Sequence, residues 1–118
     1  MISFTEKWLK AWTGNKPGEL LSFYHKNAFY RDPVVKNGLK GHQEILPYFT
    51  KLLAKNPNWV WKQKEIIPTE KGFILKWIAT ISLPSKTCEE EGLDIVEIDS
   101  DFKITRNEVY FDRTGLLS

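Results

Sequence analysis

The second half of the chain is dominated by alternation, which is clearest in Phe73-Ile74-Leu75-Lys76-Trp77-Ile78-Ala79-Thr80-Ile81. Apolar residues occupy every odd position, and their neighbours are on the whole more polar. Because successive side chains of a strand point to opposite faces, this period of two predicts a strand with one face in a core. The change to this period begins near Asn58, where Trp59 and Trp61 alternate in the same way.

Turn-forming residues divide this half of the chain into strands. Glu70-Lys71-Gly72 predicts one hairpin and Pro84-Ser85-Lys86 predicts another. Two further strands are expected around residues 87–98 and 102–113, joined by Asp99-Ser100-Asp101. The pattern therefore predicts four long antiparallel strands.

The N-terminal part has helical features instead. Ser3 followed by Glu6 matches a capping box, and apolar residues then recur at helical spacing until Gly14. Pro17 suits the first position of a second helix, which is expected to extend to about His25. These signals predict two helices before the first strand.

The first strand is expected within Asn27-Ala28-Phe29-Tyr30-Arg31-Asp32-Pro33. Proline has no backbone donor and favours an extended predecessor, so the strand should end at Asp32. Residues 36–41 form a glycine-marked loop, and a third helix should follow Gly41. Pro47 is tolerable in that helix only if the helix starts within about one turn before it.

These elements together predict an α+β fold. Three N-terminal helices would pack in a strongly curved, mainly antiparallel sheet, as in a cystatin-like cone or roll. The 118 residues suit one domain, spanning residues 1–118, and are enough to bury one core.

Composition excludes several classes of function. A net charge of +2 with mixed signs and no run of Lys or Arg argues against nucleic acid as a partner. Cys88 is the only cysteine, and no cluster of His, Cys and Asp has ligand spacing, so no metal is expected. No apolar run has membrane-spanning length, and a secretion signal is not apparent, so we expect a cytoplasmic protein without membrane contact.

Asp94 shares one strand face with apolar residues such as Val96. If that face lines the interior, burial should raise the carboxyl pKa above about 3.9 and could hold it protonated, as a hydrogen-bond donor. Asp32, at a strand end, would stay ionised and act as a base. Two carboxyls with separate proton affinities are typical of acid–base chemistry. The competing interpretation is that Asp32 is a turn residue and Asp94 only solvates a strand edge.

The order of these segments resembles the SnoaL-like, nuclear-transport-factor-two-like superfamily, a cone-shaped α+β fold that includes ketosteroid isomerase. The resemblance covers essentially the whole chain. The segments that carry it are residues 8–14, residues 29–33, Gly41 with Tyr48-Phe49, Gly92-Leu93-Asp94 and residues 107–113.

The resemblance implies roles for several residues. The isomerase base precedes a proline, which places Asp32 there, and its protonated oxyanion donor lies on the penultimate strand, which places Asp94 there. The third catalytic group, a tyrosine on the first helix, falls on Trp8, whose indole N–H can donate but lacks the acidity of a phenol. Tyr48 or Tyr24 could donate in its place. The resemblance implies no cofactor.

The same resemblance implies a cavity for a small apolar or aromatic ligand, and it assigns the lining to Trp8, Trp12, Tyr48, Trp77, Asn107, Val109 and Phe111. The mechanistic hypothesis is proton transfer next to a carbonyl, in an isomerase or cyclase-type lyase. Asp32 would be the base, and neutral Asp94 would bind the enolate oxygen together with Trp8 or Tyr48.

Two alternatives remain open. The acids could merely satisfy the buried ring N–H and O–H groups, in which case the domain would bind a ligand without catalysis. The domain could also be an interaction module, since the family commonly pairs through the outer face of the sheet. Ile78, Ile104 and Tyr110 were expected on that face as homodimer contacts.

Overall fold

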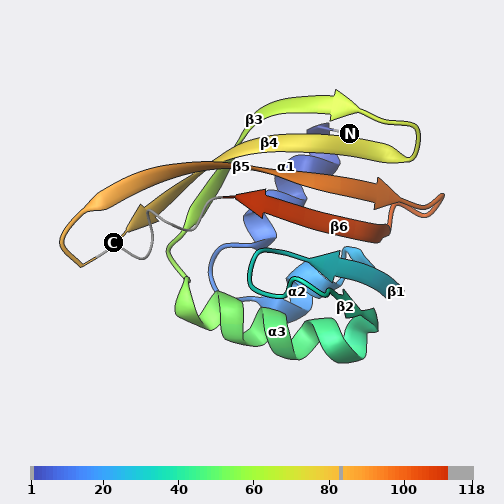
Figure 1. Cartoon of the computed structure of the whole chain (residues 1–118), viewed down its shortest axis with the longest axis horizontal. Coiled ribbons are helices and arrows are strands. Elements are labelled where there is room, and N and C mark those ends of the chain that lie inside the picture. Colours follow the sequence, from blue (N-terminus) through green and yellow to red (C-terminus); the bar gives the residue numbers. More distant parts are fainter. Residues whose placement is uncertain (1, 83, 112–118) are drawn as a thin grey trace.

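The computed structural model describes residues 2–82 and 84–111, which contain helices and one curved sheet (Figure 1). The helices are α1 (Ile2–Ala11), α2 (Pro17–Leu21) and α3 (Gly41–Lys55). The strands are β1 (Tyr24–Arg31), β2 (Leu39–Lys40), β3 (Val60–Pro68), β4 (Gly72–Ser82), β5 (Thr87–Ile98) and β6 (Ile104–Phe111). The α+β class is confirmed.

The sheet has the strand order β2-β1-β6-β5-β4-β3. Strands β1 and β6 are parallel, and the other neighbours are antiparallel. This arrangement determines where the two acids lie. Arg31, just before Asp32, pairs with Glu108 on β6, while Asp94 on β5 pairs with the next residue of β6, Val109. The register therefore brings both acids to the same level of the sheet, beside the C-terminal part of β6.

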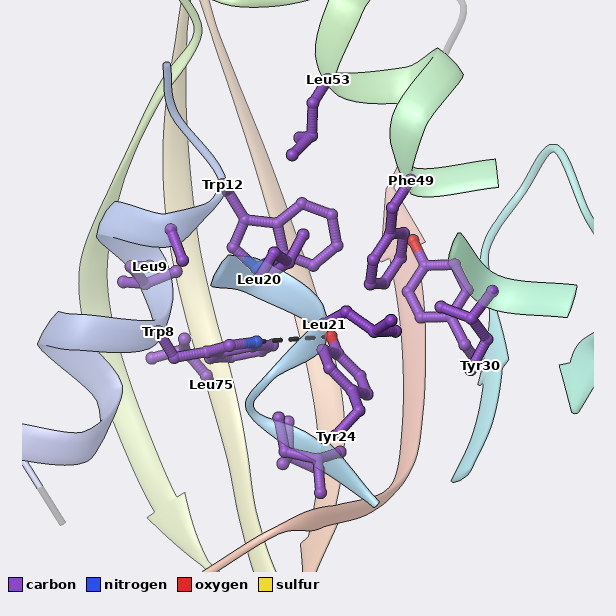
Figure 2. Packing of buried hydrophobic residues seen from close by; sticks show 14 of the residues in the cluster. Trp8, Leu9, Trp12, Leu20, Leu21, Tyr24, Tyr30, Phe49, Leu53 and Leu75 are labelled. Atoms are coloured by element: carbon purple, nitrogen blue, oxygen red, sulfur yellow. Dashed lines mark hydrogen bonds between the residues drawn. The ribbon is translucent and has the colours of Figure 1, made fainter. Parts of the chain in front are cut away.

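The alternation in β4 has the expected effect. All five odd positions from Phe73 to Ile81 are buried, and the even positions between them are half-buried. The inner face packs against the helices, and α3 contributes its buried stripe of Ile45, Phe49 and Leu53. Figure 2 shows Phe49 and Leu53 beside Trp12 and Tyr30 in this core.

Two predicted helix boundaries are corrected. Helix α1 begins at Ile2, so Ser3 lies inside it and is not its cap. Helix α2 has Pro17 at its start as expected, but it ends at Leu21 rather than near His25. The cause is tertiary: Tyr24 already pairs with Ile104 in the parallel β1–β6 ladder, which takes this segment out of the helix.

The three helices do not all precede the sheet, because α3 follows β1, as expected, and also follows β2. Strand β2 is short and lies in a segment expected to be loop. Pro47 lies six residues after Gly41, further into α3 than expected. Both Pro47 and Gln43, the residue whose carbonyl loses its bond, are exposed, so water can replace that bond.

The last strand ends at Phe111, and the predicted extension to residue 113 lies outside the described residues. Ile104 was expected on the outer face, but it is completely buried. Glu97 pairs with Arg106 while Ile98 pairs with Ile104, so Thr105 is an extra residue that resets the alternation. Tyr110 does lie exposed, and Ile78 is half-buried.

Candidate functional site

A cavity of about 80 Å³ lies between the inner face of the sheet and the second half of α3. Aromatic residues are the largest group in its lining: Trp12, Tyr30, Tyr48, Trp59, Trp61, Trp77 and Phe111. The aliphatic lining residues are Val34, Leu52, Leu53, Ala79, Ile81 and Val109. The remaining lining residues are Asp32, Asn56, Glu90 and Asp94.

Asp32 lies directly after β1 and is buried. Its Oδ1 accepts hydrogen bonds from the backbone N–H groups of Val34 and Val35, at 2.9 and 3.1 Å. Its Oδ2 accepts from the hydroxyls of Tyr30 and Tyr48, each at 2.7 Å. An ionised carboxylate offers about four lone-pair positions, so these four donors leave Asp32 no acceptor capacity for a ligand.

The local sequence explains part of this geometry. Pro33 contributes no N–H, and an Asp side chain commonly bonds the backbone two residues on in a turn. The amides of Val34 and Val35 make these bonds. The competing interpretation of Asp32 as a turn residue therefore describes one of its two oxygens.

Asp94 is equally buried but has fewer partners. The indole N–H of Trp77 donates to its Oδ1 at 2.8 Å, and the amide of Asn107 donates to its Oδ2 at 3.1 Å. About two acceptor positions remain. Burial raises the carboxyl pKa from 3.8 to about 6, against the opposing effect of these two hydrogen bonds. The pKa of Asp94 is raised, as burial predicts, but a carboxyl with a pKa of about 6 is mostly ionised at neutral pH.

A buried chain of hydrogen bonds lies behind Asp94. Tyr24 donates to the side-chain oxygen of Asn107 at 2.7 Å, and the Trp8 indole N–H donates to the Tyr24 hydroxyl at 3.3 Å (Figure 2). Burial raises the pKa of the Tyr24 hydroxyl well above its ordinary value, so it remains a donor. Because an indole N–H can only donate, the chain has one direction, from Trp8 toward Asp94.

Gly92 makes the Trp77–Asp94 contact possible. Trp77 pairs with Gly92 across β4 and β5, and a Cβ on Gly92 would lie 2.4 Å from the indole ring and 2.8 Å from the Tyr110 carbonyl oxygen. The ring therefore occupies the space that a side chain on Gly92 would need. The sequence contains both residues, but only the register shows that they face each other.

The structure distributes the predicted site residues over two layers. Trp12, Tyr48, Trp77, Val109 and Phe111 line the cavity together with Asp32 and Asp94. Trp8 and Asn107 do not line it. They lie in the chain behind Asp94, where the N–H of Trp8 is bonded to Tyr24.

Sequence reasoning missed several lining residues, most notably Glu90. The run Glu89-Glu90-Glu91 on its own predicts a solvated strand edge, but Glu90 is half-buried and lines the cavity. It precedes Asp94 by four positions on β5 and so shares its face. The even spacing between Glu90 and Asp94 was therefore the signal in the sequence that both side chains lie on one face of the strand.

The aromatic lining forms two groups. Five rings form one continuous series in the order Trp59, Trp61, Trp12, Tyr30 and Tyr48, with successive ring centroids between 5.9 and 6.3 Å apart. Trp77 and Phe111 form a second pair at 5.9 Å. The cavity thus has rigid aromatic walls, with the carboxyls of Asp32 and Asp94 among them.

The charges of the lining are all of one sign. Within the described residues, Asp32, Glu90 and Asp94 line the cavity and no Lys, Arg or His does. Arg31 points to the other side of the sheet, where it binds the Tyr110 hydroxyl at 2.9 Å. The part of the chain that the structure describes contains no group of three or more acidic, His or Cys side chains that could hold a metal ion. No helix in this part is both long and apolar enough to span a membrane.

A family model described as a SnoaL-like domain matches residues 5–107. The chain belongs to this family. The resemblance to the SnoaL-like superfamily is therefore confirmed. No curated protein sequence matches the chain.

Solved structures similar to this SnoaL-like domain share its fold at low sequence identity. A ketosteroid-isomerase-like protein from Catenulispora acidiphila, in complex with trimethylamine, has a TM-score of 0.79 at 14% identity, over 92% of this chain and 85% of its own. The epoxide hydrolase/cyclase-like enzyme SalBIII has a TM-score of 0.79 at 14% identity, over 96% and 91%. RV0760c from Mycobacterium tuberculosis, in complex with estradiol-17beta-hemisuccinate, has a TM-score of 0.76 at 13% identity, over 94% and 92%.

Proposed function

We propose that this SnoaL-like domain binds a small, largely apolar molecule in the cavity and transfers a proton next to its carbonyl group, with Asp94 as the base. The observation that carries the proposal is the unequal pairing of the two acids. Asp94 keeps acceptor capacity and has a pKa of about 6, close to the range in which a general base works well at neutral pH.

This assignment reverses the roles expected for the two acids. Asp32 was the expected base, but four donors already occupy its oxygens. Asp94 was the expected neutral donor, but Trp77 and Asn107 both donate hydrogen bonds to it, which favours the ionised form. We therefore assign Asp94 as the base and Asp32 as the group that holds Tyr30 and Tyr48.

The proposed step is an enolisation. The Asp94 carboxylate removes a proton from the carbon beside the carbonyl, the C–H electron pair becomes the C–C π bond, and the carbonyl π pair moves to oxygen. Tyr48, at the cavity wall, would exchange its hydrogen bond to Asp32 for one to the enolate oxygen. The proton on Asp94 then returns to carbon, at the same or another position.

The relatives support small-molecule chemistry without naming the ligand. One is described as epoxide hydrolase/cyclase-like, and others hold trimethylamine or a steroid ester. The cavity of about 80 Å³ is well below the roughly 300–1,000 Å³ of sites for drug-sized ligands. This size favours a ligand smaller than a steroid.

The test is hydrogen exchange, which does not require the natural substrate. Cyclopentanone and cyclohexanone are incubated with the protein in heavy water, and loss of their α-proton NMR signals is followed. The wild type is expected to accelerate exchange over buffer, and Asp94→Asn to lose about a hundredfold of that acceleration. Asp101→Asn, the same change at an exposed acid, is the control. Equal exchange by wild type and Asp94→Asn would overturn the assignment.

A ligand-binding protein without catalysis is the second candidate. The observation in its favour is Asp32, whose oxygens are occupied by neighbouring tyrosine and backbone groups as they would be in a purely structural site. It predicts that the same ketones shift the indole NMR signals of the cavity tryptophans but exchange no faster than in buffer.

We also propose that two copies pair through the outer face of the sheet. Tyr110 is exposed there, and Ile78 and Leu93 are half-buried. Analytical ultracentrifugation tests this directly, because a monomer at micromolar concentration would exclude the pairing. Ile104 takes no part, since it is buried in the core.

A further inference from the structure

We propose that the ligand of the cavity carries a compact cationic group, a quaternary or protonated tertiary ammonium. This inference rests on the small-molecule cavity of the proposed function, but it does not depend on proton transfer by Asp94.

The first argument is the balance of charge. Three acids line the cavity, and none of the lining residues within the described chain is basic. The partners of Asp32 and Asp94 are hydroxyl, amide and indole groups, all of them neutral donors. Hydrogen bonds stabilise the two carboxylates, but no basic side chain among the described lining residues compensates their charge. A cation in the cavity would do so.

The opposite face of the same sheet shows that this imbalance is local. There Glu108 bonds to both Arg31 and Arg106, and Arg106 also bonds to Glu97. Glu91 on β5 pairs with Lys64 on β3, across the intervening strand β4. Acids on the outer face thus have basic partners within the chain, whereas those in the cavity lack them. The missing partner is therefore expected from the ligand.

The second argument is the chemistry of the walls. Seven of the lining residues are aromatic, and four of these are tryptophan. Aromatic rings attract alkylated ammonium groups through the negative potential of their faces, most strongly for tryptophan, and the attraction grows when the cation is desolvated. Alkyl groups around the nitrogen can also pack against an apolar wall. An ammonium group without alkyl substituents is strongly hydrated and cannot.

The third argument is position. Asp32 and Asp94 are both nearly fully buried, while Glu90, four residues before Asp94, is half-buried. Acids are therefore found both deep in the cavity and at a more accessible point of its lining. This graded arrangement would attract a cation from solvent and then hold it against the rings.

The test compares probes of one shape and different charge. Choline is compared with dimethylbutanol, the neutral alcohol in which carbon replaces the choline nitrogen, and with the anion trimethylacetate. Binding is measured by calorimetry and by tryptophan fluorescence at low salt. Choline is expected to bind about tenfold more tightly than dimethylbutanol, with no binding of trimethylacetate. Dimethylbutanol binding as tightly as choline, or more tightly, would overturn the inference.

Variants locate the effect. Asp94→Asn and Glu90→Gln should each weaken choline binding several-fold and leave dimethylbutanol unaffected, while Asp101→Asn changes neither. If a cavity variant does not fold, the comparison of probes on the wild type still decides. The two proposals can fail separately. Ketone exchange without a preference for choline would contradict only the proposal of a cationic ligand. A preference for choline without ketone exchange would contradict only the proposal of proton transfer.

Discussion

Two buried aspartates lie at the same level of the sheet, yet their surroundings differ. Asp32 sits in a turn, where four donors occupy both of its oxygens. Asp94 sits in the middle of a strand, with two donors and a raised pKa. Equal burial therefore does not imply equal chemistry. The number of donors that the fold directs toward a buried carboxylate decides how many acceptor positions it keeps.

The largest expected difference is in stability. Asp32→Ala leaves two tyrosine hydroxyls and two backbone amides without their acceptor, at a cost of about 4 kcal/mol. Asp94→Ala leaves only the Trp77 and Asn107 donors without one, and it removes a buried charge, so we expect a smaller loss. Urea denaturation at neutral pH measures both. A larger loss of stability for Asp94→Ala than for Asp32→Ala would contradict this prediction.

The next effect is a dependence of stability on pH. Because the folded state raises the Asp94 pKa from 3.8 to about 6, it binds the proton more tightly than the unfolded chain does. The resulting stabilisation is present below about pH 4 and is lost as the pH rises through about 6, amounting to about 3 kcal/mol. Asp94→Asn should lack this contribution.

The measurement is the difference between wild type and Asp94→Asn in free energy of unfolding, from pH 4 to pH 7. The difference between the two proteins cancels the contributions of the other acids to the pH dependence. One of these acids is Asp99, whose pKa is lowered by hydrogen bonds from the backbone of Lys103 and Asp101. A difference that stays constant over this range would show that Asp94 titrates as an ordinary carboxyl.

A third experiment disturbs Asp94 without changing it. Gly92→Ala would force the Trp77 ring away from the strand, because the new Cβ lies 2.4 Å from it. We expect a loss of about 2 kcal/mol, typical of overpacking, and a change in the Trp77 indole N–H chemical shift. Gly18→Ala, where a Cβ meets nothing within 4 Å, is the matched control. An unchanged indole signal would exclude the proposed contact.

The smallest effect concerns the chain behind Asp94. Tyr24→Phe removes the donor to the Asn107 oxygen, so the amide is less firmly held in the orientation that donates to Asp94. The pKa of Asp94 should rise by a few tenths of a unit, since a bond to its ionised form weakens. Carbon-detected NMR titration measures this. Tyr110→Phe, on the outer face, should leave the Asp94 pKa unchanged.

Much of the fold was predictable because it follows local rules. The alternation around Trp77 identified a buried face, and Pro33 identified the end of β1. The end of α2 and the position of Ile104 were not predictable. The end of α2 depends on the ladder between β1 and β6, whose partners lie some eighty positions apart in the chain. The position of Ile104 depends on the extra residue Thr105 in the ladder between β5 and β6.

The site divides in the same way. The proline after Asp32 predicts that this acid lies at a strand end, and the period of two predicts that Asp94 shares a face with apolar residues, because both are local properties of the sequence. The hydrogen-bond partners of the two acids follow from the tertiary structure alone. In the folded chain two tyrosine hydroxyls donate to Asp32, and the Trp77 ring lies against Gly92. Trp8 lies behind the cavity, where it donates to Tyr24. The number of donors on a buried carboxyl depends on strand register and helix packing, which couple residues far apart in the chain.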